Sequence, residues 1–152
     1  MFHSLTPEQI HNLLSSQVVG RLAFSDGSQP YIIPVTYFYD GTYIYGQTNS
    51  GSKLNMLRKN PAVCFEVDSV LDMNHWQSAI VTGEFEELTG EEIIEARKVL
   101  FNRVFQLMTN SLVHSFEHAP GADIDDSNRV KEVVYRIKIG SITGRLLSLS
   151  KP

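Results

Sequence analysis

Cysteine is nearly absent from this sequence, because Cys64 is the only one among 152 residues. One cysteine cannot form a disulfide within the chain, and it cannot build a cysteine-rich zinc site. A chain without structural disulfides suits a reducing compartment, so we expect a cytoplasmic protein. Since Cys64 stands in the apolar run Ala62–Phe65, we expect a small buried side chain rather than a reactive thiolate.

The sequence also lacks long apolar runs and blocks of positive charge. No stretch approaches the roughly 20 apolar residues that cross a bilayer, and the first ten residues show neither region of a signal peptide. The chain has 13 lysines and arginines against 17 aspartates and glutamates, a net charge of -4. A protein that binds duplex nucleic acid needs a basic face. We therefore expect neither nucleic acid nor a membrane as a partner.

The patterning is that of a mainly β protein with one domain, residues 1–152. Six segments are typical of strands: Val18–Phe24, Tyr31–Tyr39, Thr42–Gln47, Ala62–Val67, Ser78–Leu88 and Val130–Ile142. Asp40-Gly41 stands between two of them as a strong hairpin signal. Consecutive antiparallel strands, one of them apolar on both faces, predict a small closed or split barrel, with a sandwich as the alternative.

Three helices are expected around these strands, one long and two short. The first follows a Thr-x-x-Gln capping box that begins at Thr6. The second, Lys53–Arg58, is ended by Asn60-Pro61. The long helix runs from Glu91 to about Met108 and follows a second capping box that begins at Thr89.

The segment from Thr48 to Lys53 has the chemistry of an anion site. Thr48, Ser50 and Ser52 supply hydroxyls, and Gly51 permits an unusual backbone. Lys53 adds a positive charge at the point where a strand gives way to a helix, whose first turn is itself positive. The spacing is not that of a Walker motif, so an ordinary helix start is the alternative.

Two other positions could line a ligand site. Pro34 interrupts a strand and cannot donate to its ladder, which predicts an edge or a bulge with free backbone groups nearby. A simple bulge at the barrel rim is the alternative. Trp76 is the only tryptophan and opens a strand, where its ring either packs at the rim or flanks a planar ligand.

A metal site is not expected, although one segment carries suitable residues. His114 and His118 stand four residues apart, and three aspartates follow at 123, 125 and 126. Histidines at that spacing share one face of a helix. However, Ala119-Pro120-Gly121 breaks the segment, and no His-Glu-x-x-His motif is present. We interpret it as a helix end that runs into a polar loop.

Several short motifs occur in an order that resembles one family. They are Gly20–Phe24, Pro30–Val35, Tyr39–Gly41, Gly51–Leu54, Asn60–Val63, Trp76–Ser78, Gly83, Arg136–Ile137 and Ile142–Arg145. In this order the chain resembles the FMN-binding split-barrel proteins related to pyridoxamine 5'-phosphate oxidase, and in particular their nitroimidazole-resistance branch. The similarity runs from about Val18 to Arg145.

This resemblance implies a six-stranded antiparallel split barrel that forms a homodimer, with FMN in a cleft between the protomers. By position, the expected cofactor contacts are Pro34, Val35, Thr36, Thr48, Ser50, Ser52, Lys53, Trp76 and Ser78. The resemblance assigns the phosphate and ribityl chain to the loop that ends at Lys53. It assigns the flavin ring to the strand around Pro34, with Trp76 and Ser78 as further contacts in the same cleft.

The function that the resemblance implies is a flavin-dependent oxidoreductase acting on a small molecule, with no catalytic residue assigned. Many relatives of this branch have a histidine seven residues before the lysine, where this chain has Gly46. Chemistry that depends on that histidine is therefore not transferred. The alternative is a non-catalytic protein that stores or senses flavin, or that binds haem on the same barrel through His75, His114 or His118.

Overall fold

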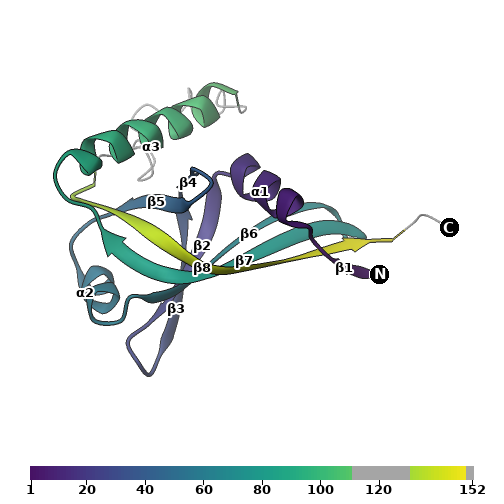
Figure 1. The fold of residues 1–152 in the computed structure, drawn as a ribbon, viewed down its shortest axis with the longest axis horizontal. Helices are drawn as coiled ribbons and strands as arrows, with labels where there is room; N and C mark the ends of the chain where they lie inside the picture. Colours follow the sequence, from purple (N-terminus) through teal and green to yellow (C-terminus); the bar gives the residue numbers. More distant parts are fainter. Residues whose placement is uncertain (111–130, 150–152) are drawn as a thin grey trace, which may run out of the picture.

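The computed structural model describes residues 1–110 and 131–149, which form one curled antiparallel sheet with three helices (Figure 1). The strands are β1 (Phe2–Ser4), β2 (Val19–Ser25), β3 (Pro30–Thr36), β4 (Phe38–Tyr39), β5 (Tyr43–Thr48), β6 (Ala62–Asp72), β7 (His75–Glu87) and β8 (Val133–Ser148). The helices are α1 (Pro7–Ser16), α2 (Ser52–Lys59) and α3 (Glu91–Asn110). The strand order is β3-β2-β6-β7-β8-β5-β4, with β1 paired to β8, so the fold is a split barrel and not a sandwich.

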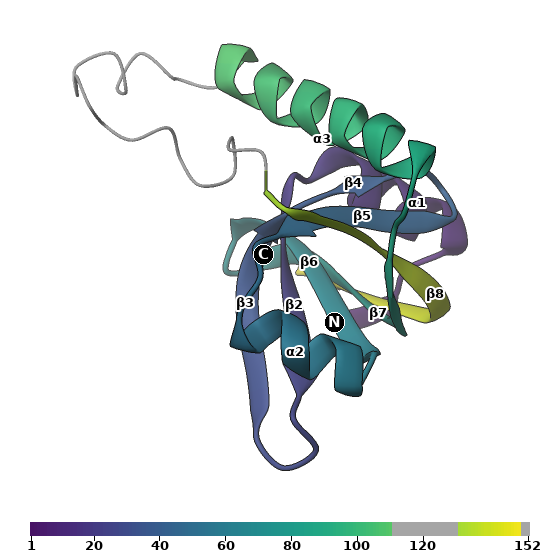
Figure 2. The ribbon, with the colours of Figure 1, turned by 90° about the vertical axis from the view of Figure 1, so that its left-hand side faces the viewer.

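The sheet curls most clearly along β7 and β8, its two longest strands (Figures 1 and 2). Their register shifts between Thr82 and Gly83, as at a β-bulge. A Cβ atom on Gly83 would lie 2.3 Å from the carbonyl oxygen of Lys138, so only glycine lets the two backbones approach this closely. Because a bulge bends its strand and increases the local twist, this position helps the sheet to close around a core.

Alternating side chains of the curled sheet point into one hydrophobic core. Leu22 of β2, Phe65 of β6 and Val81 of β7 are each almost fully buried there. The helices α1 and α2 bury their apolar faces against the same core, whereas α3 packs on a smaller cluster that contains Leu88 and Val134. The long helix therefore lies over β4 and β5, outside the barrel interior (Figure 2).

Most of the predicted start and turn signals are confirmed. The Thr6 hydroxyl accepts a hydrogen bond from the Gln9 N–H at 3.2 Å, and the Gln9 side chain accepts one from the Thr6 N–H at 2.8 Å. The predicted capping box at Thr89 is wrong. Gly90, with φ of +65°, directly precedes α3, and the Glu92 carboxylate lies 4.0 Å from Arg136 instead of turning back to the helix start.

The strand count differs from the prediction, because the described residues form eight strands and not six. The predicted strand Tyr31–Tyr39 divides into β3 and β4 at Tyr37. The N–H of Tyr37 donates to the carbonyl of Val18 at 3.0 Å, and its hydroxyl donates to the carbonyl of Leu14 at 2.6 Å. These contacts turn Tyr37 into the core and break the strand. The other additional strand is β1, three residues that pair with the end of β8.

The expectation that Cys64 is buried is wrong for the chain taken by itself. Val63 and Phe65 occupy the inward positions of β6, so Cys64 points to the outer face and is exposed. The proposed metal segment with His114 and His118 lies outside the described residues. Within the described ranges, no helix is long and apolar enough to cross a membrane.

Candidate functional site

A cavity of about 370 Å³ lies between the two ends of the curled sheet, and we call it the seam cavity. On one side is the edge strand β3, and on the other is β5, whose residues beyond Tyr45 have no pairing to β4. The lining residues are Val19, Leu22, Ile33, Pro34, Val35, Thr36, Gln47, Thr48, Lys53, Leu57, Lys131 and Tyr135. The cavity thus joins strands that are far apart in the sequence.

The charge of the seam cavity is positive. Lys53 and Lys131 both line it, and none of the described residues that line it is an aspartate or a glutamate. Burial lowers the pKa of Lys53 below the ordinary lysine value, and the nearby charge of Lys131 lowers it further. An anion placed between these two ammonium groups would relieve their repulsion. The cavity is therefore suited to a ligand with a phosphate or a carboxylate.

Lys53 is held at the cavity by the first turn of α2. This helix begins at Ser52, directly after Gly51, and no side chain of the described residues caps its first N–H groups. Unpaired N–H groups at a helix start carry partial positive charge and attract anions. Leu54 and Leu57 are buried in the core and fix the helix in place. The local structure therefore reinforces the charge of the Lys53 side chain.

Lys131 is held at the cavity by contacts of its backbone. A guanidinium nitrogen of Arg97, on α3, donates to the carbonyl of Lys131 at 2.7 Å and to that of Glu132 at 3.1 Å. The N–H of Lys131 donates to the side-chain oxygen of Gln47 at 3.3 Å. Because α3 and β5 both fix this short segment, the lysine enters the cavity from a defined position.

The wall opposite the lysines is largely apolar. It is formed by Val19 and Leu22 of β2 and by the stretch Ile33–Val35 of β3. Pro34 lies opposite Arg21 on the edge strand, which confirms that it occupies an edge. A cavity with cations at one end and an apolar wall suits a ligand that is itself amphipathic.

Five of the nine predicted contacts come together at this cavity. They are Pro34, Val35, Thr36, Thr48 and Lys53. Ser50 and Ser52 lie beside the cavity without lining it. The Ser50 hydroxyl donates to the carboxylate of Glu132, and Ser52 is the exposed first residue of α2.

Trp76 and Ser78 lie elsewhere in the chain. Trp76 pairs with Leu147 near the end of β8, and its ring contacts that of Phe2 with centroids 5.7 Å apart. β1, which contains Phe2, lies at the opposite end of the sheet from α2 (Figure 1). One copy of the chain therefore does not bring Trp76 and Ser78 to the seam cavity.

Sequence reasoning missed seven of the described lining residues: the apolar Val19, Leu22, Ile33 and Leu57, and the polar Gln47, Lys131 and Tyr135. No motif surrounds Lys131, and only the fold brings it beside Lys53. Gly46 could have indicated that a bulky side chain lies nearby, because a glycine inside a strand often marks the close approach of another group. The strand register shows that this group is Tyr135, which pairs with Gly46.

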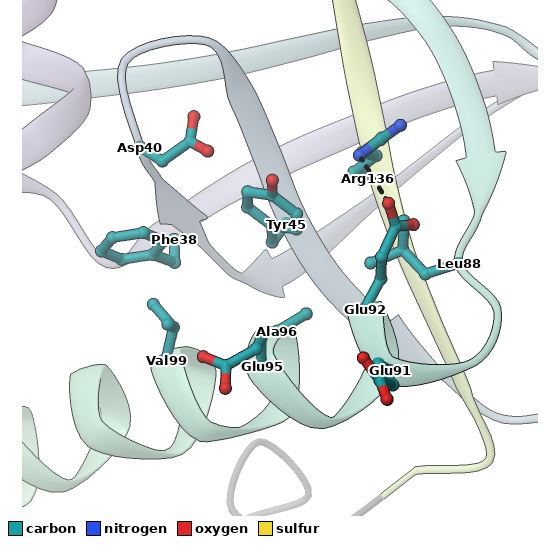
Figure 3. A pocket seen from close by; sticks show the side chains of 10 residues that line it. All are labelled: Phe38, Asp40, Tyr45, Leu88, Glu91, Glu92, Glu95, Ala96, Val99 and Arg136. Atoms are coloured by element: carbon teal, nitrogen blue, oxygen red, sulfur yellow. Dashed lines mark ion pairs between the residues drawn. The ribbon is translucent and has the colours of Figure 1, made fainter.

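A second cavity, of about 400 Å³, lies between α3 and the β4–β5 hairpin (Figure 3). Four carboxylates line it, those of Asp40, Glu91, Glu92 and Glu95, around the aromatic rings of Phe38 and Tyr45. Arg136, the one cation among the described residues that line it, is already paired with Glu86 at 2.9 Å. This acidic cavity would repel a phosphate, so the seam cavity is the better candidate for an anionic ligand.

The curled sheet with an open seam defines this chain as a split-barrel protein. The family model described as pyridoxamine 5'-phosphate oxidase matches residues 6–146, so the chain belongs to that family.

Solved structures share this fold. An FAD-binding protein from Mesorhizobium loti is 27% identical, with a TM-score of 0.72 over 97% of this chain and 99% of that one. A proposed 5-nitroimidazole antibiotic resistance protein from Bacteroides thetaiotaomicron is 17% identical, with a TM-score of 0.69 over 96% and 87% of the two chains, and shows the same fold. An uncharacterised protein from Rhizobium meliloti is 31% identical over 88 residues, 58% of each chain.

Proposed function

We propose that this protein binds FMN in the seam cavity, with the phosphate on Lys53 and Lys131 and the flavin ring against the wall formed by Ile33–Val35. The observation that carries the proposal is the pair of lysines that lines the cavity, with no carboxylate among the other described lining residues. A phosphate monoester carries close to two negative charges at neutral pH. Two ammonium groups match that charge and form charge-assisted hydrogen bonds with it.

Similarity to a flavin-binding protein supports the proposal, since the Mesorhizobium loti structure is that of an FAD-binding protein. FAD contains the flavin ring and the phosphate of FMN, with a second phosphate and adenosine added. The two lysines and the apolar wall would contact the phosphate and the flavin ring, which both cofactors contain. We assign FMN because its terminal phosphate concentrates the negative charge where the two lysines converge.

The proposal includes a homodimer in which a second copy brings Trp76 and Ser78 to the flavin. Two features of the single chain support it. Trp76 and Ser78 lie away from the seam cavity of their own chain, and the outer face of the sheet exposes apolar side chains, with Ile32 67% and Ile80 45% exposed. An apolar face of this kind is typical of an interface between subunits. We expect the two copies to bury on the order of 2,000 Å².

The proposed activity is that of a flavin-dependent oxidoreductase on a small molecule, in the cytoplasm. A bound flavin supplies the redox chemistry, while the protein binds and orients it. Among the residues that the structure describes, the cavity is lined by lysines, polar groups and a tyrosine, and by no histidine, aspartate or glutamate. These groups are compatible with hydride transfer to or from a bound flavin, and they equally suit the second candidate, a protein that stores or senses flavin without catalysis.

The test begins with the absorption spectrum of the purified protein, followed by titration with FMN, FAD and riboflavin. Flavin bands, and tighter binding of FMN than of the other two, would support the proposed cofactor. Tighter binding of FAD would overturn the choice of FMN, a Soret band would indicate haem, and a colourless protein that binds none of them would refute flavin binding. Reduction of the bound flavin by NADH or NADPH, followed by reoxidation with an added acceptor, separates an oxidoreductase from a storage protein.

A further inference from the structure

Tyr135 is an inward-facing residue of β8 at the seam cavity. Its side chain lines the cavity, although the residue as a whole is only 2% exposed. The ring packs against that of Phe85, with centroids 5.1 Å apart. The phenol is thus held rigidly by the core while part of it faces the cavity.

The ring of Tyr135 lies directly across Gly46, its partner on β5. A Cβ atom on Gly46 would be 2.4 Å from the Tyr135 hydroxyl oxygen and 2.5 Å from the carbon that carries it. Only glycine at position 46 leaves room for the hydroxyl at this point. The next residues of β5, Gln47 and Thr48, line the cavity together with Tyr135, so the hydroxyl lies over Gly46 next to the cavity.

The hydroxyl of Tyr135 has no hydrogen-bond partner in the part of the chain that the structure describes. Tyr37 provides a comparison within the same core, since it is also 2% exposed. The Tyr37 hydroxyl donates to the carbonyl of Leu14 at 2.6 Å. The Tyr135 hydroxyl is not sealed in the core like the Nε of Arg97 but opens onto the seam cavity, where water or a ligand can pair with it. An unpaired phenol at a ligand cavity therefore points to the ligand as its partner.

We propose that the Tyr135 hydroxyl donates a hydrogen bond to an acceptor on the bound flavin, and that Gly46 is required to admit it; this inference rests on the proposed function. The flavin ring offers carbonyl oxygens and ring nitrogens as acceptors. Burial raises the pKa of Tyr135 well above the usual tyrosine value, so the phenol stays protonated and available as a donor. Tyr135 is then a cofactor-binding residue in addition to the two lysines.

The test compares Tyr135→Phe with wild type in titrations with FMN and with riboflavin. Phenylalanine keeps the ring over Gly46 and removes only the hydroxyl. Loss of one hydrogen bond should weaken the binding of both flavins by about 3- to 10-fold. The melting temperature of the flavin-free variant should be no lower than that of wild type, since no internal hydrogen bond is lost. Tyr37→Phe is the matched control, because it should lower the melting temperature and leave flavin affinity unchanged.

The possible failures are distinguishable. Wild-type protein that binds no flavin would refute the proposed function and this inference together. Wild type that binds FMN, with a Tyr135→Phe variant of equal affinity for both flavins, would refute the role of Tyr135 alone. A flavin-free Tyr135→Phe variant that melts earlier or fails to fold would show that the hydroxyl is satisfied within the protein, which also overturns the inference.

Discussion

Replacing Lys53 with methionine removes one of the two charges that face the seam cavity and keeps the apolar part of the side chain. In the proposed complex Lys53 donates a charged hydrogen bond to the phosphate of FMN. Such a bond contributes about 1.5–3 kcal/mol. The dissociation constant for FMN should therefore rise by about 10- to 150-fold. Riboflavin lacks the phosphate, so its affinity should be nearly the same for wild type and Lys53→Met.

The same substitution should not destabilise the flavin-free protein. Burial and the charge of Lys131 lower the pKa of Lys53, so the folded state binds this proton less tightly than the unfolded state. Below the lowered pKa, the charged lysine therefore costs folding free energy. That cost disappears as the pH rises through the lowered pKa to the ordinary lysine value. Any stability advantage of Lys53→Met in urea unfolding should accordingly shrink toward alkaline pH.

The assay is the quenching of flavin fluorescence during titration with protein, with Lys59→Met as the matched control. Lys59 ends the same helix, is exposed and does not line the cavity, so its replacement should leave FMN affinity unchanged. Equal FMN affinity of wild type and Lys53→Met would remove Lys53 from the site. An equal loss of affinity for FMN and riboflavin would show that the variant disturbs the ring site instead of the phosphate site.

Three other substitutions test the positioning of Lys131, the core and the interface. Arg97→Met removes the donor to the carbonyl of Lys131 and should weaken FMN binding severalfold in the same titration, with little effect on riboflavin. Gly20→Ala places a Cβ 2.2 Å from the ring of Phe65, so urea unfolding should show a loss of about 1–3 kcal/mol. Light scattering should give twice the chain mass of 17.1 kDa, and Ile80→Lys on the exposed sheet face should shift it toward the monomer.

Local signals predicted those parts of the fold that short stretches of sequence control. The capping box at Thr6 and the turn at Asp40 depend on contacts within three residues, and the structure shows both. The break at Tyr37 depends on Val18 and Leu14, which belong to other elements of the fold. A run of apolar residues cannot reveal such a contact, which is why one predicted strand became two.

The residues of the candidate site also divide into those with local sequence signals and those brought together only by the fold. The stretch around Pro34 and the loop that ends at Lys53 are local features, and the sequence predicted that both contribute to a ligand site. Lys131 and Tyr135 line the cavity only because β8 lies beside β5, a pairing between segments more than 80 residues apart. At Gly46 the sequence indicates only a missing side chain, whereas the register shows that the ring of Tyr135 uses that space.

The case for a ligand at the seam is stronger than any one of its residues suggests, because three features that a ligand would satisfy coincide there. Two lysines repel each other across the cavity, the first turn of α2 has no side-chain cap among the described residues, and the Tyr135 hydroxyl has no described partner. Elsewhere the same fold pairs its charges, as Arg136 with Glu86 and Arg21 with Asp68. A single ligand with a phosphate and a ring that accepts hydrogen bonds would satisfy all three features, and FMN has both groups.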